Sequence, residues 1–528
     1  MASSYPSAGV YTKETDISQG TAAFATATGA VVGASNQGSL VKQLMTSPQE
    51  FLAEYGTPDA SVSFFHYTAL TFLAQGNALW CQRVVKNALF GGVVIKKSTT
   101  NVAFSVGRAN TTFQLDSAYT NPLFYIFAKD PGVWNNGLGI QIANLDAVAL
   151  TFDIIVFQKD STGTYVQKEK FTVSRKAQVD GNGRQIYLET RINGFSSYIV
   201  VADNTAELNT VMPIIQSTTL AMAGGDNGAV VTSAEVDAGW DNFANPSDVD
   251  VSLLLNGGYT DITIQTKIKT IAEARKDCFA ILDMDYASLV SVAAQVTWRK
   301  TTQNFNSSYC GLFSGWLNFY DQYNDIQVMI PPSGPVGAQY AYNDFVGYPW
   351  TAAAGSNRGM LNVLGVSNIY TQGDRDLLAQ NQINVIQYFP GQGIQIYDEL
   401  TEQSATSALS NIHVRRELIV IEKTLSIALR PFLFEPNNQF TRFRAKAVAD
   451  QYLNLLSSQG AFQTELGDKG FLVVCDTTNN TPAVIDLNQM NMDAFVKPIR
   501  VARAIQLQMI ITSSGASFNE IMANGISL

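Results

Sequence analysis

Val251-Ser252-Leu253-Leu254-Leu255 and Phe279-Ala280-Ile281-Leu282-Asp283 are two short apolar runs, and residues 266–276 between them have the pattern of a helix. A short apolar run bounded by turn residues predicts a buried strand. Strand, helix and strand in this order predict a mixed α/β fold in which helices cover a central sheet.

The same alternation occurs near the start of the chain. The small residues around 30–33 predict a buried strand, and residues 79–85 predict another. Between them, Ser47-Pro48-Gln49-Glu50 has the features of a helix start, with Ser as the N-cap, Pro at the first helical position and Glu as the capping-box partner. A second helix is expected at 64–75 and ends at Gly76.

A β-rich stretch interrupts this pattern between residues 91 and 239. Its short apolar runs are separated by turn signals such as Asp180-Gly181-Asn182-Gly183, and it ends near the flexible loop 224–228. We therefore interpret residues 91–239 as a β-rich domain inserted into the α/β core. Its predicted strands are 104–106, 124–128, 140–142, 152–157, 171–173, 186–188 and 198–201.

Two long helices are expected near the C-terminus. The first covers 411–430 and is stopped by Pro431, and the second covers 439–459 and is stopped by Gly460. The chain is therefore divided into an N-terminal arm (1–20), the first part of the core (21–90), the inserted domain (91–239), the middle α/β core (240–400), an inner C-terminal domain (401–502) and a C-terminal arm (503–528).

Both ends of the chain have the pattern of β-strands. Near the start this is Val10-Tyr11-Thr12-Lys13-Glu14, and near the end Ile505, Leu507, Met509 and Ile511 recur at every second position. Strands at chain ends either pair within their own subunit or add to the sheet edge of a neighbouring molecule and link copies into a polymer. From the pattern alone, both alternatives are open.

Composition limits the classes of function. Only 15% of the residues are charged and 46% are hydrophobic, which indicates uncharged polar surface or surface buried against copies of the same chain. The net charge is −10 and no basic tract stands out, so direct nucleic-acid binding is not expected. The sequence shows neither a secretory signal nor a run apolar enough to cross a membrane, so we expect synthesis in a cytoplasm and no membrane partner.

No motif of an enzyme or cofactor site stands out. His66 and His413 fall in predicted helices without a metal-ligand partner one turn away. Asp283 and Asp285 follow a strand, where α/β enzymes often place carboxylates, but no phosphate-binding loop accompanies them. The glycine-rich stretch 132–139 lacks the Lys-Ser/Thr ending of such a loop and is interpreted as a structural turn.

The cysteines support the same expectation. They are far apart and have neither metal-ligand nor redox spacing, so we expect buried free thiols in a reducing compartment. We therefore predict a protein that is not an enzyme and holds no cofactor and no metal. The four cysteines are Cys81, Cys278, Cys310 and Cys475.

Arg415-Arg416-Glu417 is the densest charge cluster on a predicted helix. A solvated helix face is the first interpretation, and a salt bridge at an interface is the alternative.

A series of segments, in order along the whole chain, resembles the contractile phage tail sheath protein family. The strongest pair is Val414-Arg415-Arg416 followed by Phe434-Glu435-Pro436-Asn437. The others are Gly9-Val10-Tyr11 with Glu14, Ala128-Lys129-Asp130-Pro131-Gly132-Val133-Trp134-Asn135-Asn136, Ala272-Glu273-Ala274-Arg275-Lys276-Asp277-Cys278-Phe279, Pro331-Pro332-Ser333-Gly334, Ala352-Ala353-Ala354-Gly355, Ile383-Asn384-Val385-Ile386, and Lys497-Pro498 with Gly515-Ala516-Ser517-Phe518-Asn519-Glu520.

This resemblance implies a structural subunit that polymerises, as a helical stack of hexameric rings, into a jacket around the inner tail tube. Contraction of such a jacket drives the tube through the host envelope for DNA delivery. The implied partners are further copies of the chain, the tail tube protein, and the baseplate and tail terminator proteins, and the implied location is the virion tail. In the family the two terminal arms add strands to a neighbour's inner sheet, and insertions lie on the outside.

The helix expected at 439–459 is the candidate contact with the tube. It carries Arg442, Arg444 and Lys446 near its start. An ordinary helix that covers the core is the alternative. For the whole chain, the alternatives are the sheath subunit of a bacteriocin-like or secretion-type contractile machine, a viral capsid or tube protein, and a hydrolase with a β-rich accessory domain.

Overall fold

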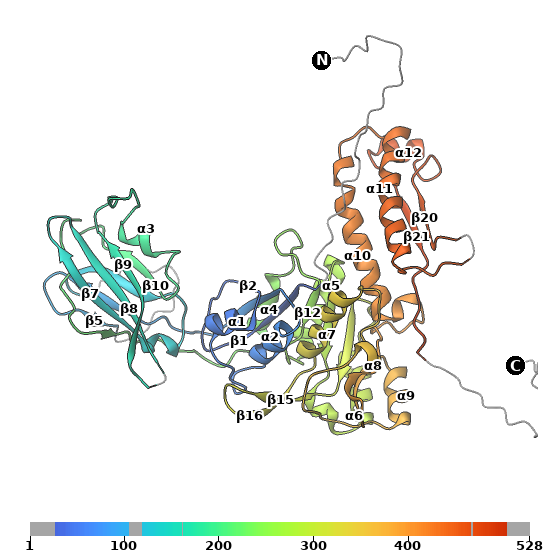
Figure 1. Ribbon diagram of the computed structural model, residues 1–528, viewed down its shortest axis with the longest axis horizontal. Coiled ribbons are helices and arrows are strands. Elements are labelled where there is room, and N and C mark those ends of the chain that lie inside the picture. Colours follow the sequence, from blue (N-terminus) through green and yellow to red (C-terminus); the bar gives the residue numbers. More distant parts are fainter. Residues whose placement is uncertain (1–26, 105–118, 161, 466–467, 504–528) are drawn as a thin grey trace, which may run out of the picture.

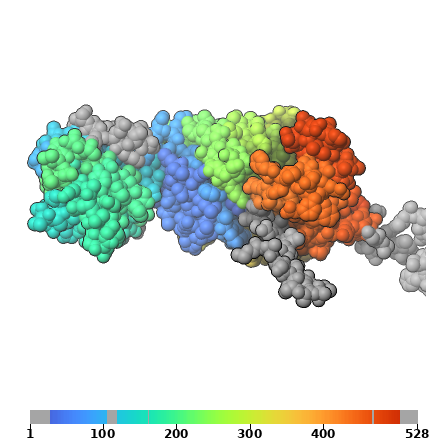
Figure 2. All heavy atoms as spheres, turned by 90° about the horizontal axis from the view of Figure 1, so that it is seen from above, coloured from blue at the N-terminus to red at the C-terminus, as the bar shows by residue number. Residues whose placement is uncertain are grey.

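The computed structural model describes residues 27–104, 119–160, 162–465 and 468–503. These residues form three units in a row: a β-rich unit at one end, an α/β unit in the middle and a mainly helical unit at the other end (Figures 1 and 2). The predicted terminal strands, Val10 to Glu14 and Ile505 to Ile511, lie outside the described residues.

The middle unit is built on an eight-stranded sheet with the order β19-β18-β14-β13-β12-β1-β3-β2. Six neighbouring strands run parallel, and β2 and β19 close the two edges as antiparallel strands. The strands are β1 (Gly29–Ala34), β2 (Gln43–Met45), β3 (Leu79–Val84), β12 (Leu253–Leu255), β13 (Phe279–Asp283), β14 (Cys310–Ser314), β18 (Ile383–Phe389) and β19 (Gly393–Ile396). A smaller sheet of β15 (Leu317–Asp321), β16 (Ile326–Ile330) and β17 (Gly365–Val366) lies beside it.

Helices cover both faces of this sheet, because its strands are apolar on both sides. Val31 of β1 belongs to the core on one face, while Ala30 and Val32 belong to the core on the other. The predicted layered α/β core is therefore confirmed. The first face is covered by α1 (Pro48–Tyr55), α2 (Phe65–Leu73) and α7 (Ser333–Val346), and the second by α4 (Ser233–Asp241), α5 (Ile262–Arg275), α6 (Val292–Thr297) and α9 (Gln372–Gln380); the short helix α8 (Gly355–Arg358) follows α7.

The local signals explain where these helices begin. The Ser47 side chain accepts a hydrogen bond from the Glu50 amide, and Pro48 opens α1, as the sequence predicts. The expected capping box differs from the structure, because the Glu50 carboxylate accepts from the amide of Thr46 over 2.8 Å. Helix α5 starts earlier than expected, at Ile262, because Asp261 caps it by accepting from the Thr263 amide.

The β-rich unit is a pair of four-stranded antiparallel sheets that enclose an apolar core, and a smaller apolar cluster lies on the other face of one of them. One sheet has the order β10-β6-β4-β5 and the other β11-β7-β8-β9. Its strands are β4 (Gly92–Lys96), β5 (Val102–Ala103), β6 (Pro122–Ala128), β7 (Leu138–Asp146), β8 (Thr151–Lys159), β9 (Tyr165–Val173), β10 (Ile199–Asp203) and β11 (Leu220–Ala221).

Two expectations for this unit differ from the structure. The strand predicted at 186–188 is reduced to an isolated parallel bridge between Tyr187 and Ser174. Leu188 already opens the helix α3 (Leu188–Ile192), where its side chain is buried together with that of Ile192, one turn away. Helix α4 begins inside the stretch assigned to the insertion, yet it packs against β1 and β3 of the middle unit. Its Gly239 lies so close that an added Cβ would be 2.6 Å from Val32. The chain has therefore returned to the core before residue 233.

The third unit contains the two predicted long helices, α10 (Ile412–Ala428) and α11 (Gln439–Ser458), the strands β20 (Phe471–Val474) and β21 (Asp493–Val496), and the short helix α12 (Pro482–Asp486). Helix α10 joins this unit to the middle one, because Ile412 and Ile419 belong to the core of the α/β unit and Ile421 to the core of the third unit. Among the described residues, no helix is long and apolar enough to cross a membrane.

Candidate functional site

The third unit contains a sheet of only two strands. β20 and β21 pair antiparallel, with Leu472 opposite Phe495 and Val473 opposite Ala494. Within the described part of the chain, no other strand pairs with either outer edge. A two-stranded sheet with open edges presents rows of unpaired backbone groups and is a template for strand addition.

The direction of these backbone groups follows from the ladder. The Lys497 amide donates to the Gly470 carbonyl over 2.8 Å, so this pair is of the hydrogen-bonded kind. Because hydrogen-bonded and non-hydrogen-bonded pairs alternate, the amides and carbonyls of Ala494 and Val496 point away from β20. These are the groups that an added strand would meet at the outer edge of β21.

The two faces of the small sheet differ. Val473 is buried on the inner face, against the core that includes Leu453 and Leu456 of α11. On the outer face, Leu472 and Phe495 remain 57% and 59% exposed. The hairpin is therefore anchored on one side and offers an apolar surface on the other.

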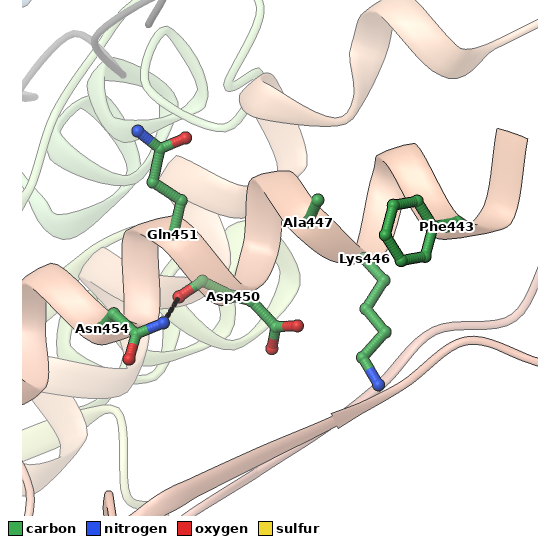
Figure 3. Close-up of a pocket in the computed structure, with 6 residues that line it drawn as sticks. All are labelled: Phe443, Lys446, Ala447, Asp450, Gln451 and Asn454. Carbon is green, nitrogen blue, oxygen red and sulfur yellow. Dashed lines mark hydrogen bonds between the residues drawn. The ribbon is translucent and has the colours of Figure 1, made fainter. Parts of the chain in front are cut away.

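A shallow groove of about 510 Å³ runs along α11, which packs against β20. Figure 3 shows Lys446 and Asp450 extending from the side of α11 that faces the β-ribbon in that view. Phe443 is 68% exposed at one end of the groove, so the groove combines an apolar anchor with one cation and one carboxylate. It is lined by Phe443, Lys446, Ala447, Asp450, Gln451 and Asn454.

Of the three residues predicted to contact a tube, the structure places two at the surface and one in the interior. Arg444 lies at the surface of α11, where its guanidinium is 5.8 Å from the centre of the Phe440 ring, and Lys446 lines the groove. Arg442 is only 7% exposed and donates to Asn437 Oδ1, so it does not lie at the surface as we expected. It points inward because it lies three and seven positions before the buried Ala445 and Ala449, on the same face of the helix.

The charge cluster on α10 is buried, so the interpretation as a solvated face is wrong. Arg416 donates to both carboxylate oxygens of Asp344, in α7, one of them over 3.0 Å. Arg415 lies over the Tyr309 ring, 4.3 Å from its centre. Glu417 is completely buried, and neither of its carboxylate oxygens has a hydrogen-bond partner among the described residues. Burial raises the pKa of Glu417 to about 8.

The acidic and histidine residues considered as catalytic candidates in the sequence make contacts within the fold. The buried Asp283 carboxylate accepts from the Ser333 amide at 2.7 Å and from the Gly258 amide at 2.9 Å, and so fixes the start of α7. His66 lies 3.1 Å from the Tyr55 carbonyl, and His413 Nδ1 lies 2.9 Å from Glu399 Oε2. In the described ranges, no three His, Cys, Asp or Glu residues come together as metal ligands.

Residues 229–401, which contain most of the central sheet, match the family model of the phage tail sheath protein central domain. This part of the chain therefore resembles the central domain of phage tail sheath proteins. The matched segment begins where the chain returns from the β-rich unit, shortly before α4.

Curated tail sheath proteins match a larger part of the chain. The chain is 32% identical over 323 residues to the tail sheath protein of Enterobacteria phage T4, and the matched segment covers 57% of this chain and 48% of that protein. It is 28% identical over 384 residues to the tail sheath protein of Vibrio phage KVP40, covering 67% and 55%. The matches thus span about half the length of these relatives. The predicted resemblance to the contractile phage tail sheath family is confirmed.

Solved structures extend the likeness in fold to nearly the whole chain. The sheath tail protein from Listeria innocua superposes with a TM-score of 0.57 at 10% identity, over 86% of this chain and 89% of that one. A sheath complex of the extracellular contractile injection system PVC, in its contracted state, gives 0.54 at 15% identity, over 97% and 98%. At these identities the likeness shows the fold, and it confirms the predicted mixed α/β class.

Proposed function

We propose that the chain is the structural subunit of a contractile phage tail sheath. The sheath central domain and the likeness to tail sheath proteins support this. The observation that carries the assembly step is the two-stranded sheet β20–β21, which is anchored on α11 and open at both edges within the described residues.

In this proposal the terminal arms of neighbouring copies complete the small sheet. The N-terminal arm contributes Val10, Tyr11, Thr12, Lys13 and Glu14, and the C-terminal arm contributes the alternating residues Ile505, Leu507, Met509 and Ile511. Each added backbone hydrogen bond contributes about 1 kcal/mol net. Because each copy donates arms and accepts others, the contact is head-to-tail and generates an open helical polymer of stacked hexameric rings.

The surface of α11 that carries Arg444 and Lys446 is the proposed contact with the tail tube, with Phe440 and Phe443 as apolar anchors. These two aromatic side chains are 69% and 68% exposed, which suits residues that become buried in a partner. Arg442 is omitted from this surface because it is buried.

The assembled jacket surrounds the tube in the virion tail, with the baseplate and the terminator at its ends. Its contraction drives the tube through the host envelope for DNA delivery. The extended sheath is a metastable packing held until it is triggered, so the subunit supplies no enzyme activity of its own. A sheath subunit of a related injection machine is the second candidate, which the likeness to the PVC sheath favours.

The test blocks the open edge of β21 without disturbing the hairpin. Proline at Ala494 removes an amide that points away from β20, a position where edge strands tolerate proline. Ala494→Pro is expected to leave a folded subunit that forms no tubes in negative-stain electron microscopy, while Ala494→Ser, which keeps the amide, polymerises like the unchanged chain. Tubes of normal length from Ala494→Pro would refute strand addition at this edge.

A further inference from the structure

Two connecting segments join the β-rich unit to the α/β unit, and they pair with each other side by side. The chain leaves after β3 and returns before α4, and the Leu89 amide donates to the Asp226 carbonyl over 2.9 Å. The Ala229 amide donates to the Lys86 carbonyl over 2.8 Å. Two paired strands alone form a ribbon that bends, so further contacts decide whether the units move independently.

The guanidinium of Arg83, at the end of β3, supplies such contacts. Arg83 is 1% exposed, and it donates from Nε to the Ser35 carbonyl over 2.9 Å and from Nη1 to the Gly38 carbonyl. Its Nη2 donates over 2.9 Å to the carbonyl of Pro131, which belongs to the β-rich unit. A single planar side chain thus joins β3, the loop after β1 and the inserted unit.

A second set of side chains ties the same segment down. The Val133 amide donates to Asn227 Oδ1 over 2.8 Å, and Asn227 Nδ2 donates to Asn36 Oδ1 over 2.9 Å, so the bridge reaches from the inserted unit through the return segment to the α/β unit. Asn136 and Gly225 exchange two hydrogen bonds of 2.9 and 3.0 Å.

The packing at this junction has little spare room. A Cβ at Gly132 would lie 2.6 Å from the Asn36 carbonyl oxygen, and one at Gly228 would lie 2.0 Å from the Lys86 carbonyl oxygen. Both glycines have positive φ, at 141° and 79°. Any larger residue would push the segments apart, so close contact between the units depends on these positions.

We infer that Arg83 locks the β-rich unit to the α/β unit, so that the two behave as one rigid body with a fixed relative orientation. Arg83 is a positioning residue, because it acts through the carbonyls of Ser35, Gly38 and Pro131. The inference goes beyond the proposed function, because it assigns this junction the same geometry before and after contraction.

The test measures the distance between the units in the full chain. Spin labels are placed at Thr190→Cys in α3 and at Ala238→Cys in α4, both exposed, while the native cysteines are buried. Double electron–electron resonance is expected to give one narrow distance distribution. Arg83→Met broadens this distribution, whereas Arg184→Met, whose side chain pairs with Asp180 within the β-rich unit, leaves it narrow. A broad distribution in the unchanged protein, or a narrow one in folded Arg83→Met, would overturn the inference.

Hydrogen exchange of the unchanged protein decides the matter if Arg83→Met does not fold. The amides of Leu89, Asp226 and Gly132 are expected to exchange as slowly as those of β1, because a rigid junction opens only when the core opens. Exchange that is much faster than in β1, with the strands of the β-rich unit still protected, would contradict a locked junction.

Discussion

The free energy of unfolding is expected to fall as pH rises, because of Glu417. Replacing Glu417 by Gln is expected to remove this loss. Glu417 is fully buried in α10, and its carboxylate oxygens have no partner among the described residues. Burial disfavours the charged form, so the pKa rises from 4.5 to about 8 on folding. The folded protein therefore binds a proton that the unfolded chain releases, and stability falls as pH rises between these two values.

The size of the effect follows from the two pKa values. Each pH unit between about 5 and 8 costs about 1.4 kcal/mol, so Glu417 alone lowers the free energy of unfolding by about 3 to 4 kcal/mol over that range. Gln has the shape of the protonated Glu and cannot ionise. The variant is therefore expected to be close in stability to the unchanged protein at pH 5 and more stable by several kcal/mol at pH 8.

Urea denaturation at pH 5, 6, 7 and 8, followed by circular dichroism, measures this difference. Other buried groups also titrate in this range, since burial raises the pKa of Asp283 and of Asp130 to about 6, and the difference between variant and unchanged protein removes their shared contribution. Glu422→Gln, at an exposed position of the same helix, serves as the matched control and is expected to change the free energy of unfolding by about 0.5 kcal/mol or less. An equal pH dependence in the unchanged protein and Glu417→Gln would refute the reasoning.

Three further predictions concern assembly and packing. Deleting residues 1–18 is expected to leave a soluble subunit that sediments as small particles, and large tubes from this deletion would contradict the role of the N-terminal arm. Reversing the charges of Arg444 and Lys446 to Glu is expected to weaken co-sedimentation with purified tail tubes while polymers of the subunit still form, and undiminished tube binding would remove α11 as the contact. Leu453→Ala is expected to lower the free energy of unfolding by about 2 to 5 kcal/mol because Leu453 is fully buried, whereas Leu455→Ala, at a position that is 50% exposed, costs about 1 kcal/mol or less; equal losses would show that the core of the third unit is assigned wrongly.

Short-range patterns in the sequence predict most of the helices and strands of the fold. Ser47 with Pro48, and Pro431 and Gly460 after the long helices, mark helix ends through contacts within a few residues, and the structure has its helices there. The apolar runs of the central sheet are continuous because both faces are covered, and this is visible without knowledge of strand order.

The misplaced features depend on partners that are distant in the sequence. Arg416 is buried because Asp344, 72 positions away in the sequence, accepts its hydrogen bonds. A run of charged residues on a predicted helix does not indicate that such a distant partner exists. Leu188 shows the same limit on a smaller scale, since Leu188 and Ile192 fit either a strand edge or a short helix until the rest of the unit is placed. The junction formed by Arg83 could not be predicted either, because its acceptors are backbone carbonyls, which every residue carries.

The measurement that tests the central claim most directly is negative-stain electron microscopy of the purified full chain beside Ala494→Pro and Ala494→Ser. The account predicts hollow, striated tubes from the full chain and from Ala494→Ser, and only small particles from a folded Ala494→Pro. Tubes from all three proteins would contradict assembly by strand addition at β21, and small particles from all three, with purified tail tubes present to nucleate assembly, would contradict a sheath subunit.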